Sequence, residues 1–232
     1  MKKKIFAIAF AAILAVTAIT GASLAYLTDT DKEENVFTFG NVDIDLQETF
    51  DQNSKLIPGV DINKDVWVMN VGSEDAYVRV HIAIPTILDD GDPSFDASSN
   101  VLHFNFDMDS VADGQWSWNK TVDGANYPTD GNGWNFYTAT IDGIAYNVYV
   151  VTYETALTSQ AGTTTYAMDK VYIDTKVTNE DIADIKLILG DTPIIKVFAE
   201  GCQTATFTDA FDALNTAFGT PTADGYVAPW NK

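Results

Sequence analysis

The sequence has few of the residues on which enzyme chemistry depends. Its 232 residues include one cysteine, Cys202, and two histidines, His81 and His103. A single cysteine excludes an intrachain disulfide, and because no histidine lies near it in the sequence, we expect a buried, structural thiol. The chain has no GxSxG, SxxK or HExxH motif and no phosphate-binding glycine loop. We therefore predict no catalytic residues.

Positive charge is also scarce. The chain has 13 Lys and Arg against 33 Asp and Glu, which gives a formal net charge of -20. Such a charge repels nucleic acid and anionic membrane surfaces, so a nucleic-acid partner is not expected. The acidic residues are spread along the chain, often in Asp-, Asn- and Gly-rich loops, which is typical of a solvated surface.

The one long apolar run is at the N-terminus, from Ile5 to Ile19. Three lysines precede it, and the small-residue pattern Ser23-Leu24-Ala25 follows it. This is the pattern of a secretory signal peptide, here residues 1–25, with cleavage between Ala25 and Tyr26. The alternative is an uncleaved N-terminal anchor. Either way, we expect a protein outside the cell, in the extracellular matrix or on the cell surface.

The mature chain, residues 26–232, has neither a fixed-period repeat nor a Pro- or Ser-rich linker, so we predict a single β-sandwich domain. It begins with an arm, residues 26–39, in which the polar stretch YLTDTDKEEN leads into Val36-Phe37-Thr38-Phe39. The polar stretch has no clear period and is expected to be exposed.

Alternating apolar residues predict about nine strands. The clearest is Tyr77–Ile84, where Val78, Val80, Ile82 and Ile84 share one face and Tyr77, Arg79 and His81 share the other. An Asp142-Gly143 turn between apolar runs predicts a hairpin. The other predicted strands are 42–46, 66–71, 102–108, 136–141, 144–153, 171–177, 185–189 and 194–199.

One segment has a helical period instead. Phe207, Ala210, Phe211, Leu214, Ala217 and Phe218 are spaced by three and four residues, with Thr208 as the expected N-cap and Gly219 and Pro221 beyond the end. The sequence thus predicts a mainly β protein, an antiparallel, jelly-roll-like sandwich with a short C-terminal amphipathic helix.

Metal-binding signals are weak. His81 and His103 fall on the polar faces of predicted strands, which favours two surface histidines over a zinc site shared with an aspartate. The Asp-rich segments 89–96 and 107–113 suit Ca²⁺ chemically, but neither matches an EF-hand loop. We therefore predict no metal, with Ca²⁺ or Zn²⁺ as alternatives. Three tryptophans in polar loops suggest a carbohydrate- or protein-binding surface as a further alternative: Trp116, Trp118 and Trp134.

Several segments together resemble the TasA/camelysin family of Gram-positive bacteria, whose leaders are cut by the dedicated signal peptidase SipW. They are the leader end SLAYLTDTD, then ENVFTFGNVDIDL, PGVDINKDVWVMNVGSEDAYVRV and IKVFAEGCQTATFTDAFDALNTAFG. Residues 86–165 carry no part of the resemblance.

The resemblance implies a jelly-roll subunit that polymerises into biofilm matrix fibres, alone or with an accessory fibre subunit. The arm of one copy would complete a sheet of the next by donor-strand exchange, through Tyr26, Leu27, Val36, Phe37 and Phe39. An arm that folds onto its own sheet is the alternative. The family name also implies a cell-surface metallopeptidase, which would have to use His81, His103 and an unidentified carboxylate.

Overall fold

The computed structural model describes residues 40–51, 54–55, 57–91, 99–106, 115–118, 136–190 and 195–221. The chain divides into residues 1–39 and residues 40–232. The predicted signal peptide, its cleavage site at Ala25 and Tyr26, and the arm with Leu27, Val36, Phe37 and Phe39 all lie outside the described residues.

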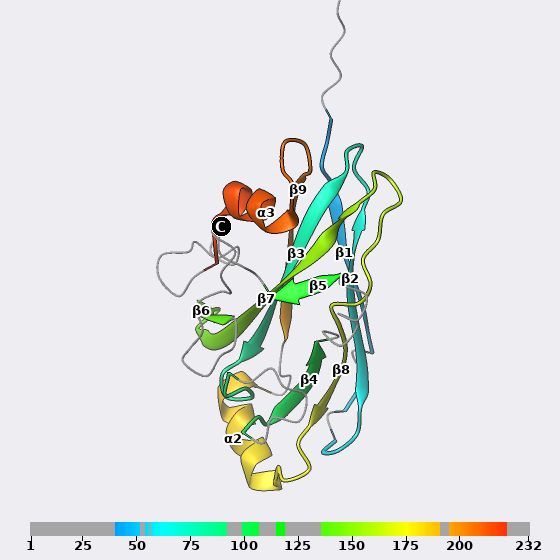
Figure 1. The fold of residues 1–232 in the computed structure, drawn as a ribbon. Helices are drawn as coiled ribbons and strands as arrows, with labels where there is room; N and C mark the ends of the chain where they lie inside the picture. The colour runs from blue at the N-terminus through cyan, green and yellow to red at the C-terminus, as the bar shows by residue number, and fades with distance from the viewer. Residues whose placement is uncertain are drawn as a thin grey trace, which may run out of the picture. The chain divides into compact units, whose positions relative to one another are not determined.

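From Gly40 onward the chain forms two antiparallel sheets (Figure 1). The first sheet has the order β1-β2-β8-β4, with β1 at Ile44–Phe50, β2 at Ile62–Asn70, β8 at Met168–Ile173 and β4 at Leu102–Phe106. The second has the order β5-β7-β3-β9, with β5 at Trp116–Trp118, β7 at Ile144–Leu157, β3 at Ala76–Pro85 and β9 at Lys196–Gln203; β6, Phe136–Ile141, also pairs with β7. The mainly β, antiparallel prediction is confirmed, and the jelly-roll connectivity stays a prediction.

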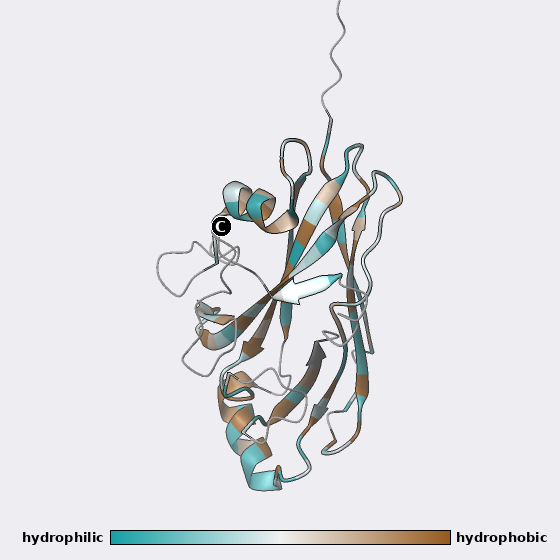
Figure 2. Cartoon of the chain, viewed as in Figure 1, coloured by the Kyte–Doolittle hydropathy of each residue, from teal (hydrophilic) through white to brown (hydrophobic). Residues whose placement is uncertain are grey.

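The core lies between the sheets, where the period-2 pattern places one apolar face of each strand (Figure 2). Val66 and Val68 of β2 and Val78 and Val80 of β3 are fully buried there. Burial of each such side chain stabilises the fold by roughly 1.5–3 kcal/mol. The alternation predicted for Tyr77–Ile84 therefore assigns the core face of β3 correctly.

The predicted hairpin is present between β6 and β7. Asp142 and Gly143 both have positive φ, 54° and 84°. A two-residue turn with this backbone matches the twist of the flanking strands, and glycine adopts it without strain.

Two predicted strands need correction. Residues 185–189 belong to a helix, α2 (Asn179–Leu189), which begins with a capping box between Thr178 and Asp181. β8 covers Met168–Ile173 and ends four residues before the predicted end, because Asp174 accepts hydrogen bonds from the backbone of Lys176 and Val177 and turns the chain.

The C-terminal helix is α3, Ala210–Phe218. Its N-cap is Asp209, not the predicted Thr208: the Asp209 carboxylate accepts the backbone N–H of Asp212 at 2.9 Å. α3 packs on the outer face of the second sheet with Cys202, which is buried as expected. Neither described helix is both long enough and apolar enough to span a bilayer.

Candidate functional site

A buried polar network lies under α3, on the outer face of the second sheet. Arg79 of β3 donates from Nε to Glu200 of β9 at 2.6 Å, from Nη1 to Asn215 of α3 at 3.0 Å, and from Nη2 to the Gly219 carbonyl at 3.0 Å. The Arg79 guanidinium carbon also lies 5.8 Å from the centre of the Phe218 ring. One buried cation therefore joins two strands to the C-terminal helix.

His81 extends this network toward β6. Its Nε2 lies 3.1 Å from Glu200 Oε2, and its Nδ1 lies 3.2 Å from the Tyr137 hydroxyl. An ionised carboxylate only accepts hydrogen bonds, so Nε2 carries the hydrogen and Nδ1 accepts the Tyr137 O–H.

The pKa values in this network follow from burial and from the neighbouring charges. Burial, reinforced by the Arg79 charge, lowers the pKa of His81 despite its hydrogen bond to Glu200. Burial acts to raise the pKa of Glu200, but the His81 hydrogen bond and the Arg79 charge outweigh it and leave that pKa lowered. The network therefore holds a charged Arg79–Glu200 pair beside a neutral His81.

The sequence interpretation of this face was wrong. His81 was expected at the surface, yet His81 and Arg79 are both 0 % exposed. Arg79 is bonded to Asn215 of α3, and His81 contacts Tyr137 of β6 and Phe198 of β9. Arg79 and Glu200, which sequence reasoning missed, are the centre of the site. The available signal was an arginine and a histidine two residues apart on one face of a strand, in a chain with few cations.

His103 lies on the first sheet, so the structure does not bring the two histidines together as a joint site. It is 2 % exposed, stacks on Tyr172 at 4.5 Å and contacts Asp174 Oδ2 through Nε2 at 2.8 Å. The surface prediction is therefore wrong for His103 too. In the part of the chain that the structure describes, no group of three or more His, Cys, Asp or Glu is arranged to hold a metal ion.

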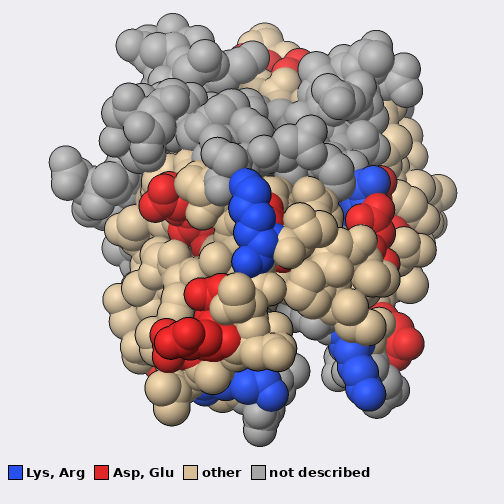
Figure 3. All heavy atoms as spheres, turned by 90° about the horizontal axis from the view of Figure 1, so that it is seen from below, with Lys and Arg blue, Asp and Glu red and all other residues tan. Residues whose placement is uncertain are grey.

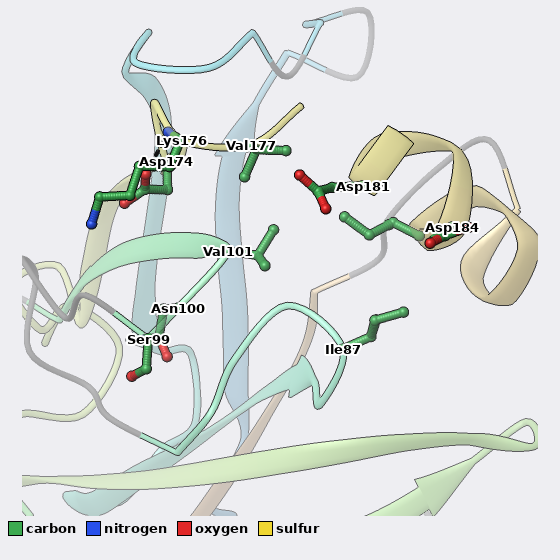
Figure 4. Close-up of a pocket in the computed structure, with 10 residues that line it drawn as sticks. Ile87, Ser99, Asn100, Val101, Asp174, Lys176, Val177, Asp181 and Asp184 are labelled. Carbon is green, nitrogen blue, oxygen red and sulfur yellow. Dashed lines mark hydrogen bonds between the residues drawn. The ribbon is translucent and has the colours of Figure 1, made fainter. Parts of the chain in front are cut away.

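Asp174 also lines an open cleft between β8, α2 and the loop after β3 (Figure 4). The cleft has a volume of about 370 Å³. Figure 4 shows Asp174 and Lys176 on one wall and Asp181 and Asp184 of α2 on another. Hydrogen bonds from the Lys176 backbone and from His103 lower the pKa of Asp174. This carboxylate therefore already has hydrogen-bond partners within the protein.

Asp89 is the one described position of segment 89–96 with a buried carboxylate. It accepts hydrogen bonds from Gly91 N, Asn147 Nδ2 and the Tyr149 hydroxyl, and burial raises its pKa. These bonds tie the loop after β3 to β7. Segment 107–113 and Asp92 to Asp96 lie outside the described residues.

Trp116 is a core residue. It is 1 % exposed, packs on Tyr153 at 5.0 Å and donates from Nε1 to the Thr165 carbonyl. A role for Trp116 in stacking on a ligand is therefore wrong. Trp134 and the side chain of Trp118 lie outside what the structure describes.

The inward-facing residues of the edge strands are buried to different degrees on the two sides of the sandwich. On one side, the inward-facing residues Leu102, Phe104 and Trp116 are 1 or 2 % exposed. On the other side, formed by β1 and β9, the inward-facing apolar residues are only partly buried: Ile44, Leu46, Phe50, Val197 and Ala199. We call this second side, defined by β1 and β9, the open side.

β1 and β9 approach each other at one end of the open side. A methyl group at Gly201 would stand 2.8 Å from the Ile44 side chain, so Ile44 fills the space beside Gly201. Among the described strands, β1 pairs with β2 alone and β9 with β3 alone. Each is therefore an edge strand among the described strands.

Residues 1–94 match the family model described as camelysin metallo-endopeptidase. The match covers the first 94 of the 232 residues and confirms the resemblance to the TasA/camelysin family. The match covers β1, β2 and β3, whereas β9 and α3 come from the part of the chain beyond it. No curated protein matches the chain.

Proposed function

We propose that this protein is a secreted structural subunit of extracellular matrix fibres and that copies assemble through the N-terminal arm, residues 26–39. Export would use the signal peptide 1–25, removed between Ala25 and Tyr26 by a SipW-type signal peptidase. The principal partner is a second copy of the same chain, with or without an accessory fibre subunit.

The open side of the sandwich carries this proposal. Partly buried apolar residues on β1 and β9 would lose their remaining contact with water if a further strand covered them. Strand addition would also pair the backbone groups along the edge. β1, the first strand after Gly40, lies at one border of this side (Figure 1).

The arm has the composition that such a strand requires. Val36-Phe37-Thr38-Phe39 offers β-branched and aromatic side chains over four consecutive residues. The preceding residues are polar and provide a link of ten residues, 26–35, which spans roughly 33 Å when extended.

The test compares three proteins: the chain from Tyr26, the chain from Gly40, and the chain from Tyr26 with Val36, Phe37 and Phe39 changed to Ser. The third keeps the length of the arm and removes its apolar side chains. We expect fibres by negative-stain electron microscopy from the first protein, and folded monomers by light scattering and circular dichroism from the other two. Folded monomers from all three would refute self-assembly, and fibres from all three would refute the role of the arm.

A metallopeptidase is the second candidate function, and the description of the matched family favours it. Its ligands would have to include His81 or His103, which already contact Glu200 and Asp174. Stoichiometric zinc together with proteolysis that a chelator abolishes would establish this activity.

A further inference from the structure

The outer face of the first sheet carries apolar side chains that are exposed to solvent. Met69 is 37 % exposed, Tyr166 44 % and Val71 47 %. Trp67 lies half-buried on β2, two residues before Met69. We call this surface, defined by Trp67, Met69, Val71 and Tyr166, the Trp67 face. An exposed apolar patch with a polar border is typical of an interaction site.

The alternation in β2 directs the Trp67 face away from the core. Val66 and Val68, on either side of Trp67 in the chain, are fully buried between the sheets. Successive side chains of a strand point to opposite faces, so Trp67 and Met69 point outward. The Trp67 face is therefore separate from the open side, whose apolar residues point inward, and its role does not depend on fibre assembly.

Trp67 and Tyr166 form an aromatic pair at the centre of this face. Their ring centres are 5.5 Å apart, and the ring planes are inclined at 59°. A face-to-face stack would cover one face of each ring, and this inclination excludes it. Tyr166 is held beside β2 because the backbone N–H of the next residue, Ala167, donates to the Val66 carbonyl at 2.7 Å. Two segments distant in the chain thus build one aromatic surface.

Carboxylates border the Trp67 face. Asp45 of β1 is directly opposite Met69, so both side chains lie on the outer side of the sheet. Asp65 precedes Trp67 by two residues on β2 and shares its side of the strand. Among the described residues, neither Asp45 nor Asp65 forms an ion pair. The aromatic surface therefore has an acidic border.

The lysines of the surrounding strands are engaged elsewhere. Lys64 of β2 is buried and pairs with Glu48 at 2.8 Å. Lys170 of β8 lies 3.4 Å from Asp61. β1 contains no basic residue. The three strands β1, β2 and β8 thus supply no cation to the two carboxylates at the border.

An aromatic pair beside carboxylates suits a guanidinium group. The planar guanidinium of arginine stacks on aromatic rings and forms paired hydrogen bonds with a carboxylate. The ammonium group of lysine is a compact, strongly hydrated charge that lacks this planar surface. A neutral sugar would stack on the rings but would not use the charges of Asp45 and Asp65. The acidic border therefore favours arginine.

A second copy of this chain does not supply that arginine. The sequence has one arginine, Arg79, which is 0 % exposed and bonded to Glu200. Two copies, each with a formal net charge of -20, also repel each other at long range. A basic protein is attracted by the same charge. The partner that fits the Trp67 face is therefore a different protein.

We propose that the Trp67 face binds an arginine-containing basic segment of another protein. The guanidinium stacks on the Trp67 ring while Asp45 or Asp65 accepts its hydrogen bonds. The apolar stem of the arginine side chain contacts Met69.

Peptide binding tests the proposal. Fluorescence anisotropy follows a labelled peptide of alternating Arg and Gly as the chain from Tyr26 is added. We expect saturable binding that Trp67→Ala weakens by about threefold to tenfold and Asp45→Asn by about twofold or more. The matched control Glu180→Gln removes the same charge on α2 and should leave the affinity unchanged. A peptide of alternating Lys and Gly should bind more weakly than the Arg peptide.

The other outcomes overturn the proposal. Equal affinity in every variant would show a general attraction to an acidic protein, and an equal affinity for the Lys peptide would remove the role of the guanidinium. The absence of binding would refute the site outright. Binding of a neutral oligosaccharide in place of the peptide, lost in Trp67→Ala, would identify a sugar site. Self-association that Trp67→Ala abolishes, without peptide binding, would identify a contact between copies.

A second measurement uses the unmodified chain, so that a variant that fails to fold does not decide the matter. Hydroxyl-radical footprinting with mass spectrometry compares oxidation with and without the Arg peptide, in monomers and fibres alike. We expect oxidation of Met69 and Tyr166 to slow by about twofold or more, because a bound peptide covers them. Leu187 of α2, which is 84 % exposed, should be unchanged. Protection of Leu187 alone, or of none of the three, would overturn the proposal.

Discussion

At the residue scale, the stability of the second sheet depends on Arg79. Removal of its side chain takes one charged hydrogen-bond donor away from the buried Glu200, which still contacts His81, and from the buried Asn215. We expect Arg79→Ala to lower the free energy of unfolding by about 3–5 kcal/mol, measured by urea denaturation. As a control, Lys170→Ala removes a surface pair with Asp61, 3.4 Å apart, and should cost less than about 1 kcal/mol. Similar losses in the two variants would contradict the network as described.

The same network makes stability depend on pH through His81. Because burial lowers the pKa of folded His81 below its ordinary 6.5, the unfolded chain binds the proton first as the pH falls. Stability is therefore lost below about pH 6.5, until the folded pKa is reached. The lowered pKa of Glu200 acts in the same direction at lower pH, and the raised pKa of Asp89 acts in the opposite direction. Arg79, Glu200, Tyr137 and Phe198 are the groups around the His81 ring.

We therefore expect His81→Gln to flatten the fall in the free energy of unfolding between about pH 7 and pH 5, because glutamine does not titrate there. Urea denaturation at three pH values measures this slope for the variant and the unchanged protein. The same slope in both would show that His81 is not the titrating group.

At the element scale, the sequence pattern predicts strands where one face meets the core. The alternation in β3 and the Asp142-Gly143 turn identify a strand and a hairpin correctly, because period-2 burial and positive φ leave clear residue patterns. α2 was missed although Ile182, Ile185 and Leu189 have helical spacing and Thr178 begins a capping box, because the short run of Ile and Leu at 185–189 reads as a strand.

The sequence pattern does not predict whether another element covers the face of a strand that points away from the core. Arg79 and His81 alternate with core residues as solvent-facing residues would, but α3 packs against Arg79 and Tyr137 of β6 packs against His81, and both are buried. Their partner Glu200 is 121 residues from Arg79 in the chain. Likewise, the position of β1 and β9 at the edges of their sheets depends on strand order, which alternation alone does not determine.

At the scale of the whole molecule, charge opposes assembly while the open side favours it. The formal net charge is -20, and no fibre forms without bringing acidic copies together. Figure 3 shows acidic and basic side chains side by side on the described surface seen from below. If copies assemble as proposed, long-range repulsion should limit the rate at which they meet, whereas burial of apolar residues at the open side should hold them once they are paired.

We accordingly expect added NaCl to shorten the lag before fibres appear. Between 0.01 M and 0.15 M salt the screening length falls from about 30 Å to about 8 Å, which weakens repulsion between subunits but not burial of the arm. Light scattering over this range measures the lag for the chain from Tyr26, with the chain from Gly40 as the control that should not scatter. A longer lag in salt would mean that opposite charges attract at the subunit contact, and the acidic arm would then have to bind at a basic surface instead of at the open side.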